Sequence, residues 1–251
     1  MGFLFLLLGA AAASGFVLPE LMGQNDGDYA TSEDQPDDVA ATTDVSSFLS
    51  DFITLTNEGT ADGGEGDDTI VAETNGDEDD YTNEDVVYSF DLNGGNGNDD
   101  ITLDGAAEQD GLDSTNTVDA GADDDTVELT GDFGSHVDEL DLGAGDDSVT
   151  LGYGSVVESL TLGAGADEVV MGDIATEATI EDFDPEEDVL VFDLGLTHIT
   201  EDNIDDFLGF KEDDDGLMVT VTDDWSGEIY SMVYLKGLTM ADIPALTFAY
   251  A

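Results

Sequence analysis

Short turns rich in glycine and aspartate recur in the middle of the chain, and they carry the residues best suited to chemistry. They span residues 63–70, 94–101, 120–127, 142–149 and 162–169. In each turn an aspartate lies two positions before an isoleucine or a valine. Glycine permits the positive φ angles of tight turns, and a carboxylate supplies the hard oxygen ligand that calcium prefers. The turns therefore predict calcium binding at the corners of a coiled, parallel β-structure.

The residues around each turn alternate between apolar and polar side chains, as a half-buried β-strand requires. Apolar residues lie two and four positions after each key aspartate, in the pairs Ile70/Ala72, Ile101/Leu103, Val127/Leu129, Val149/Leu151 and Val169/Met171. A second set lies on the strands that return to the next turn, at Leu92, Val118, Leu140, Leu160 and Ile180. Stacked coils would align both sets into one core. We therefore expect a β-solenoid over residues 51–182.

The spacing of the turns indicates coils of unequal length. Their second glycines are separated by 31, 26, 22 and 20 residues. The insertion around residues 75–83 leaves open whether the first two turns stack. The opposite corners, at residues 131–134, 152–155 and 172–175, contain glycine without the regular aspartate. We therefore expect one row of corners to be competent for metal binding and the other to be structural.

The turns resemble the RTX (hemolysin-type) calcium-binding repeat G-G-x-G-x-D-x-U-x, in which U is a large apolar residue. The first two turns match every defined position, and the fourth and fifth replace only the first glycine, by leucine. The third has Ala120 at the first position and Asp123 in place of the fourth-position glycine. The resemblance covers roughly the middle half of the chain, and it implies an all-β fold: a parallel β-roll with calcium held between stacked turns.

The resemblance also implies a ligand set. The key carboxylates would be Asp68, Asp99, Asp125, Asp147 and Asp167. Backbone carbonyls would come from Gly64, Gly66, Gly95, Gly97, Gly143, Gly145, Gly163 and Gly165. Auxiliary ligands would be Asp67, Asn98, Asp124 and Asp146. In the third turn Gly121 and Asp123 join the candidates, and Asp123 either distorts the turn or adds a ligand. The gaps between stacked turns would hold up to about four calcium ions.

Charge limits the partners of this chain. Asp and Glu number 63 against two lysines, so the formal net charge is −61. Nucleic acid is excluded as a partner, and anionic membrane surfaces would repel the protein. A halophilic or solubility-driven surface explains part of the excess, but it does not explain acids at fixed positions in glycine turns. The chain has no cysteine, so as an exported protein it would need a stabilising element other than disulfides, and bound metal is one.

The two ends of the chain differ in character from the repeats. Residues 2–22 are almost wholly apolar. A signal peptide, a membrane anchor and a buried or amphipathic segment all remain open for them. Residues 23–50 have the composition of an acidic disordered linker. From residue 183 we expect the repeat to break and residues 183–251 to form a β-rich cap.

Within the cap, we expect a short helix near residues 202–208 and strands at 217–221 and 229–235. The block also resembles the C-terminal region of RTX proteins exported by type I secretion, with an apolar tail at residues 245–251. That resemblance implies the type I secretion machinery as a partner. A distinct cap would also protect the solenoid edge from pairing with other chains.

These patterns lead to one main functional hypothesis and two alternatives. A ladder of carboxylates would repel itself until cations neutralised it, so we expect a secreted or cell-surface β-roll that folds on calcium. We expect no catalysis, since the sequence holds no nucleophile–base, phosphate-loop or HExxH motif and little length before residue 63 for a catalytic domain. The alternatives are a surface-adhesion or matrix protein and the export module of an enzyme or toxin. The oligomeric state stays open.

Overall fold

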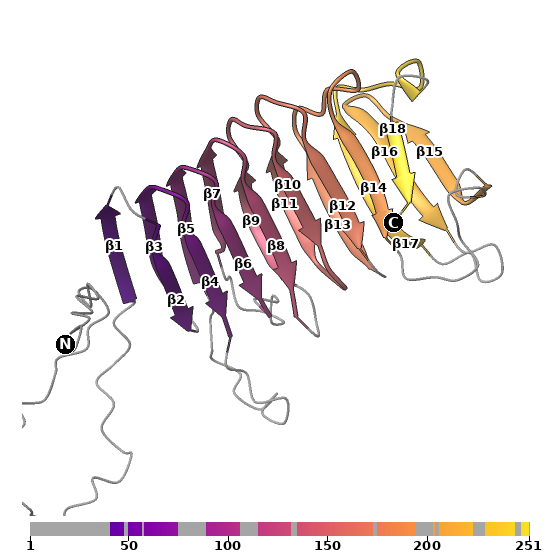
Figure 1. Ribbon diagram of the computed structural model, residues 1–251. Helices are drawn as coiled ribbons and strands as arrows, with labels where there is room; N and C mark the ends of the chain where they lie inside the picture. The colour runs from indigo at the N-terminus through magenta and orange to yellow at the C-terminus, as the bar shows by residue number, and fades with distance from the viewer. Residues whose placement is uncertain are drawn as a thin grey trace, which may run out of the picture.

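A computed structural model describes residues 41–47, 50–56, 58–74, 89–105, 115–131, 135–172, 175–193, 203, 206–222, 229–243 and 247–250. Over these residues the chain forms β-strands and turns without an α-helix. The strands coil into a two-sided parallel solenoid, so that the β-roll expected from the sequence is confirmed (Figure 1). Each coil contributes one strand to each of two sheets and has a corner at either end.

The first sheet contains the five strands that follow the glycine–aspartate turns, with β2 before them and β14 and β18 after them, and its neighbouring strands are all parallel. In spatial order they are β2 (Phe52–Thr56), β4 (Thr69–Glu73), β6 (Asp100–Asp104), β8 (Thr126–Thr130), β10 (Ser148–Leu151), β12 (Glu168–Gly172), β14 (Val189–Asp193) and β18 (Thr247–Tyr250). Because the register is continuous from coil to coil, equivalent side chains stack directly above one another.

The second sheet contains the strands that lead into the glycine–aspartate turns, together with strands that precede and follow the repeats. Its parallel part contains β1 (Ala41–Ser47), β3 (Glu58–Glu65), β5 (Ser89–Asn96), β7 (Thr117–Ala122), β9 (His136–Asp141), β11 (Val156–Thr161), β13 (Thr176–Ile180) and β17 (Ile229–Lys236). Antiparallel pairing then adds β16 (Gly216–Thr222) and β15 (Leu208–Glu212). This hairpin edge closes the C-terminal end of the sheet with strands of opposite direction.

The core lies between the two sheets and is built as the apolar alternation predicts. The side chains of Ile70, Ile101, Val127, Val149 and Val169 are fully buried and share one register position. The returning set from Leu92 to Ile180 is buried on the opposite sheet. Ile53 continues the first stack before the repeats, and Leu190 continues it after them. Stacked aliphatic side chains thus run the length of the solenoid.

Two expectations about the flanking segments need correction. The stacking does not end at residue 182, because β14 pairs with β12 and β17 pairs with β13, both in parallel. Residues 41–47, within the expected linker, form β1 and pair with β3. The short helix expected near residues 202–208 falls mostly outside the described residues, of which residue 203 lies in a turn and residue 206 has a 3₁₀ conformation before β15 begins at Leu208. The strands expected at 217–221 and 229–235 are confirmed as β16 and β17.

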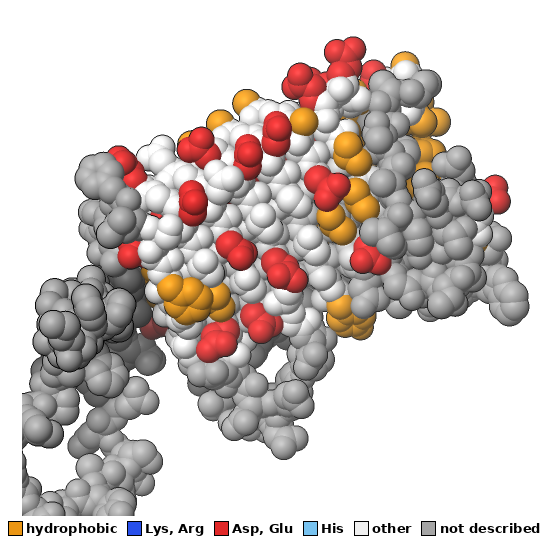
Figure 2. Space-filling view, in the orientation of Figure 1, with side chains coloured by type: hydrophobic (Ala, Val, Ile, Leu, Met, Phe, Trp, Pro, Cys, Tyr) orange, Lys and Arg blue, Asp and Glu red, His pale blue; other side chains and the backbone are white. Residues whose placement is uncertain are grey.

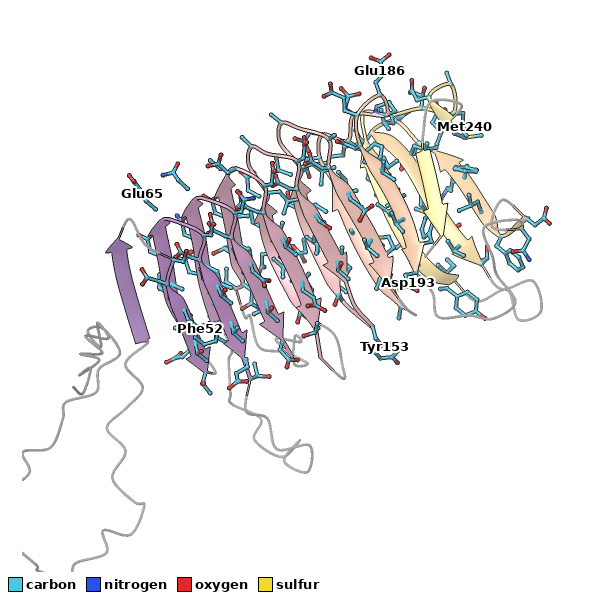
Figure 3. All side chains as sticks on the ribbon, in the orientation of Figure 1. Phe52, Glu65, Tyr153, Glu186, Asp193 and Met240 are labelled. Carbon is cyan, nitrogen blue, oxygen red and sulfur yellow. The ribbon has the colours of Figure 1, made fainter. Side chains whose placement is uncertain are left out.

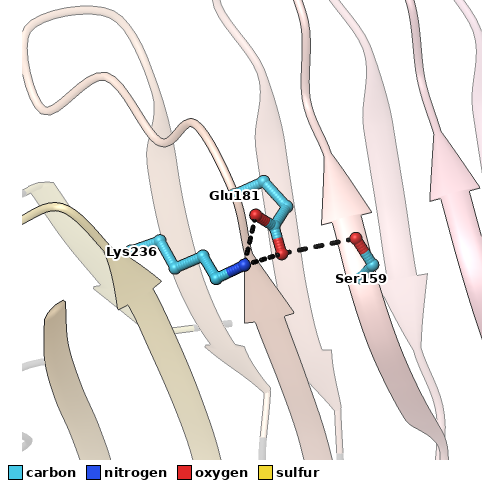
Figure 4. A network of polar contacts seen from close by, with 3 residues as sticks. All are labelled: Ser159, Glu181 and Lys236. Carbon is cyan, nitrogen blue, oxygen red and sulfur yellow. Dashed lines mark hydrogen bonds and ion pairs between the residues drawn. The ribbon is translucent and has the colours of Figure 1, made fainter. Parts of the chain in front are cut away.

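Strand β17 is also fixed to the solenoid by a charged contact (Figure 4). The ammonium nitrogen of Lys236 lies 2.6 Å from both carboxylate oxygens of Glu181, and the Ser159 hydroxyl lies 3.4 Å from the same carboxylate. Acidic side chains are spread over the visible face of the molecule, and that view shows no basic one (Figure 2). In the described part of the chain no helix is long and apolar enough to cross a membrane. Residues 2–22 lie outside that part.

Candidate functional site

The glycine–aspartate turns stack on one another and form a single acidic corner of the solenoid. Gly64 pairs with Gly95, and Gly95 pairs with Gly121, so the first two turns stack despite their 31-residue spacing. Further along, the amide of Ala144 donates to the carbonyl of Gly121 at 3.0 Å, and Ala164 donates to Gly143 at 3.0 Å. The glycine turns therefore continue the hydrogen-bonded ladder of the sheets around the corner.

Most turn positions of this corner need glycine because successive turns lie backbone against backbone. A Cβ added at Gly97 would lie 2.0 Å from the carbonyl oxygen of Gly66, and one at Gly143 would lie 2.0 Å from that of Gly121. Asp123 takes the position of a glycine with φ 80°, a conformation that aspartate tolerates better than most residues. Its amide donates to the Ala144 carbonyl at 2.8 Å, so the third turn keeps its register and is not distorted.

The key aspartates of the turns form a continuous buried row, which we call the aspartate ladder. Its members are Asp68, Asp99, Asp125, Asp147, Asp167 and Asp188, each 2–3% exposed. From Asp99 onward, the Oδ1 atom of each carboxylate accepts a hydrogen bond from the backbone amide of the preceding member, as in Asp68 to Asp99 (2.8 Å) and Asp125 to Asp147 (2.7 Å). The Oδ1 atom of Asp68 accepts the amide of Asp51 at 2.6 Å. Each aspartate therefore joins its own coil to the coil before it.

The second carboxylate oxygen of the ladder is left without such a partner. Among the described residues, Oδ2 of Asp68, Asp99, Asp125 and Asp147 is buried and has no hydrogen-bond partner. Buried polar atoms normally have a hydrogen-bond partner. A buried neutral group without a partner costs ~1–3 kcal/mol of stability, and a charged group costs more. These oxygens thus distinguish the acidic corner from an ordinary structural turn.

Burial changes the protonation of the ladder. Desolvation is the largest cause in every case, and it raises the pKa of Asp99 to about 6, of Asp125 to about 7 and of Asp167 to about 6. The pKa values of Asp68, Asp147 and Asp188 are raised as well. The hydrogen bond from the preceding amide opposes the rise, and neighbouring carboxylates add to it. The ladder therefore holds negative charge at neutral pH at a free-energy cost.

The auxiliary candidates form a second, exposed row on the outside of the corner. Asp67, Asp124 and Asp146 accept backbone hydrogen bonds from the next turn, through the amides of Asn98 (3.1 Å), Asp146 (2.9 Å) and Ala166 (3.0 Å). These carboxylates bind the turns to one another. In Figure 3, Glu65 marks this end of the strands, and Tyr153 marks the opposite corner.

Sequence reasoning missed two carboxylates at the end of the ladder. Asp188 accepts the amide of Asp167 at 3.1 Å through Oδ1 and the amide of Asp184 at 2.7 Å through Oδ2. Asp182 accepts the amides of Leu162 (2.8 Å) and Gly163 (3.0 Å). Asp188 also lies two positions before an apolar residue, Leu190, and that spacing was the available indication. The last glycine turn is therefore closed by side chains, without another glycine turn above it.

Among the described residues of the opposite corner, the buried polar side chains are small and neutral, and we call it the neutral corner. Its buried members are Ser135, Ser155 and Thr176. The Ser135 hydroxyl donates to the Thr130 carbonyl (2.9 Å), the Ser135 amide donates to the Ser155 hydroxyl (3.3 Å), and Thr176 donates to the Ser231 hydroxyl (3.0 Å). This corner is closed by hydrogen bonds between neutral groups, as the expected structural role requires.

The donors of the acidic corner are hard oxygens, which suit calcium better than a transition metal. Carboxylates alone do not form a cage there, since within the described ranges no three His, Cys, Asp or Glu side chains come together as metal ligands. The second-position carbonyls, such as those of Gly121 and Gly143, already accept one amide each. A cation would therefore draw on the free Oδ2 atoms together with the remaining lone pairs of turn carbonyls.

Comparison with known proteins adds little to this description. No family model matches the chain, and no curated protein gives a significant match. Among solved structures, the extracellular lipase LipA from Serratia marcescens is similar with a TM-score of 0.28 and 14% identity, over 82% of this chain and 39% of the lipase chain. The chain thus spans well under half of the lipase. The β-roll assignment rests on the strand register and the stacked turns.

Proposed function

We propose that this protein is a calcium-binding β-roll that completes its folding when calcium neutralises the aspartate ladder. The observation that carries the proposal is the row of buried Oδ2 atoms on Asp68, Asp99, Asp125 and Asp147 without a hydrogen-bond partner among the described residues. A bound divalent cation would supply the missing partner and the missing positive charge together. The acidic corner would then be the functional site of the molecule.

The energetics favour a folding switch. Two carboxylates about 5 Å apart repel by about 1 kcal/mol in water and by about 3 kcal/mol at an effective dielectric constant near 20. The ladder repeats that repulsion from coil to coil with no basic side chain in its hydrogen bonds. A cation that binds only the folded state adds about 2.7 kcal/mol per site at a hundredfold excess over its Kd. A few sites would therefore shift the folding equilibrium decisively.

The residues that would hold the ions are the free ladder carboxylates and the glycine-turn carbonyls. The last gap, between Asp167 and Asp188, is the least suited, because both oxygens of Asp188 accept amides. The exposed Asp67, Asp124 and Asp146 would attract cations to the corner through their charge. The proposal thus centres calcium binding on the four carboxylates from Asp68 to Asp147.

The proposal extends to location and to the absence of catalysis. Calcium at millimolar concentration is found outside cells, so a protein that folds on it would be secreted or displayed on the surface, with export by a type I route. The ladder carboxylates are engaged by backbone amides, which suits ion binding and not proton transfer to a substrate. An adhesive role through a threonine row gains no support, because the central outward column of the first sheet mixes Thr54, Val71, Thr102 and Glu128.

The test is a calcium titration of the purified protein in chelator, followed by far-ultraviolet circular dichroism and calorimetry. We expect a cooperative gain of β-structure with calcium that magnesium does not reproduce. The variant Asp125→Asn keeps an oxygen for the Asp99 amide but removes the charge, and it should raise the calcium midpoint about tenfold, equivalent to ~1.4 kcal/mol.

The matched control is Glu128→Gln, which removes one exposed charge from the neighbouring strand β8 and should leave the midpoint within about twofold. A wild-type protein with its full β-spectrum in chelator would disprove the folding switch. A midpoint that moves equally in both variants would show that calcium responds to overall charge and not to the ladder.

A further inference from the structure

A groove of about 530 Å³ lies on the second sheet, where the last solenoid strands meet the β16–β17 hairpin. None of its lining residues belongs to the aspartate ladder or to the glycine turns. It crosses strands β11, β13, β17 and β16, which places it on the outer surface where the stacked coils pass into the antiparallel edge. The groove is therefore independent of the proposed calcium sites.

The floor of the groove is apolar. It is lined by the partly buried side chains of Met218, Met232 and Tyr234. The residues that alternate with them on the same strands, such as Leu217 and Val233, are fully buried in the core. Met218 and Tyr234 face each other across the β16–β17 pair. Methionine side chains are flexible and polarizable, and they adapt to varied apolar partners. The outward surface of this hairpin thus offers an apolar floor to a ligand.

The rim of the groove is acidic. Glu158 and Glu177 line it and are exposed. Glu158 lies 3.5 Å from the imidazole of His136, and its side chain is 62% exposed. The carboxylate of Glu177 makes no ion pair with any described residue. The two carboxylates lie on β11 and β13, on one side of the apolar residues of β17 and β16. An apolar surface beside two carboxylates matches a ligand that combines apolar groups with positive charge.

We propose that this groove binds an extended, basic and apolar segment of a partner polypeptide. The chain itself cannot readily fill it, because it has only two lysines and Lys236 is bound to Glu181 (Figure 4). A second copy is disfavoured, because each copy carries a formal net charge of −61. The groove spans four strands, or about 14 Å, which accommodates an extended segment of about four residues. Apolar side chains would contact the methionines, and the basic groups would meet Glu158 and Glu177.

The experiment measures binding of a fluorescein-labelled peptide of alternating leucine and lysine by anisotropy, with the full chain in calcium. Salt at about 0.3 M suppresses long-range attraction to the acidic surface. We expect this peptide to bind at least about tenfold more tightly than leucine–serine and leucine–glutamate peptides of the same length. Met232→Ser should weaken binding about fivefold, and Glu177→Gln about threefold.

Two control variants lie on the first sheet. Val170→Ser removes a partly exposed apolar side chain, and Glu128→Gln removes an exposed charge, and each should change the affinity less than about twofold. Circular dichroism confirms that each variant is folded, and Glu177→Gln alters only an exposed side chain. Equal losses in Glu177→Gln and Glu128→Gln would overturn the proposal in favour of attraction to the net charge. Equal binding of the leucine–serine peptide, or self-association that Met232→Ser abolishes, would also overturn it.

Discussion

The two corners of each coil solve the same problem with different chemistry. Both corners must provide hydrogen-bond partners for the backbone N–H and C=O groups that are not paired within the sheets where the chain turns. At the neutral corner, Ser135, Ser155 and Thr176 do so with hydroxyl groups whose hydrogen bonds lie within the protein. At the acidic corner, a carboxylate does so with one oxygen and leaves the other buried without a partner among the described residues.

This difference shows that the charge of the acidic corner exceeds what the fold needs. At the described residues of the neutral corner, Ser135, Ser155 and Thr176 make their hydrogen bonds without an ionisable partner, so a neutral acceptor is sufficient for stacking there. An aspartate at the same task carries a desolvation cost, which the raised pKa values record. Because this desolvation cost recurs in successive coils, the acidic corner is suited to bind a cation from solution. The neutral corner of the same molecule provides the comparison.

The largest expected effect comes from filling the space between turns. Gly143→Ala places a Cβ 2.0 Å from the Gly121 carbonyl at φ 92°, whereas Gly172→Ala, near the neutral corner, places one 3.0 Å from the Leu151 carbonyl without a positive φ. Overlap and backbone strain together should lower the free energy of unfolding by about 3 kcal/mol for Gly143→Ala and by less than ~1 kcal/mol for Gly172→Ala. Urea denaturation in saturating calcium measures both, and equal losses would contradict the backbone-against-backbone stacking of the acidic corner.

The next effect is a pH dependence that comes mainly from the acidic corner, which holds the largest pKa shifts. The folded-state pKa values of Asp99, Asp125 and Asp167 are raised to about 6, about 7 and about 6, above the 3.8 of an exposed aspartate. At a pH between the unfolded-state pKa of 3.8 and the raised pKa values, the folded state binds more protons than the unfolded state. The free energy of unfolding is therefore greatest at acidic pH, and this stability is lost as pH rises through 6 to 7. Thermal unfolding in chelator should therefore show a Tm about 5 °C or more higher at pH 5 than at pH 8.

Calcium should flatten or reverse that pH profile, because the ion competes with protons for the same carboxylates. The control is the profile of Asp125→Asn in chelator, which should be shallower since it lacks the group with the highest of the raised pKa values. A wild-type Tm that rises steadily from pH 5 to pH 8 in chelator would mean that the ladder is stabilised by its charge, contrary to the burial that the structure shows.

Much of the fold could be predicted from the sequence because the same spacing of glycine, aspartate and apolar residues recurs in each repeat. Ile70, Val127 and Val169 follow their aspartates at one fixed distance, and period-two alternation identifies the buried face of each strand. The glycines identify the corners because no other residue fits where Gly97 meets Gly66. The core and the row of turns were therefore accessible without a structure.

The remainder depended on contacts between coils, which the sequence does not display. Asp188 joins the ladder from a turn without glycine, so its role becomes visible only when β14 is seen to pair with β12. The neutral corner has no motif, because Ser135 finds its partner Ser155 only through the stacking of the next coil. The use of Oδ1 by the preceding backbone amide, which leaves Oδ2 alone for a cation, likewise follows from register and not from residue type.

A smaller effect sharpens the comparison from the neutral side. Ser155→Ala removes the hydroxyl that accepts the Ser135 amide at 3.3 Å. It should lower the free energy of unfolding by about 1 kcal/mol, since a buried amide loses its acceptor. The calcium midpoint should stay within about twofold of the wild-type value after correction for that loss. Ser148→Ala, at a half-buried position on β10, is the matched control, and a large calcium shift in Ser155→Ala would refute the separation of roles between the corners.

The smallest effect concerns an acid that already has its cation within the protein. Glu181 is neutralised by Lys236, whose nitrogen lies 2.6 Å from both carboxylate oxygens, with side-chain exposures of 45% for Lys236 and 29% for Glu181 (Figure 4). Because solvent screens such a pair, Lys236→Met should cost only about 0.5 kcal/mol in calcium, and the cost should shrink in 1 M salt. Lys211→Met removes the same charge from exposed β15 and should cost less. If Lys236→Met instead made folding dependent on calcium, any carboxylate without a countercharge would bind calcium. Calcium binding would then not depend on the buried position of the ladder.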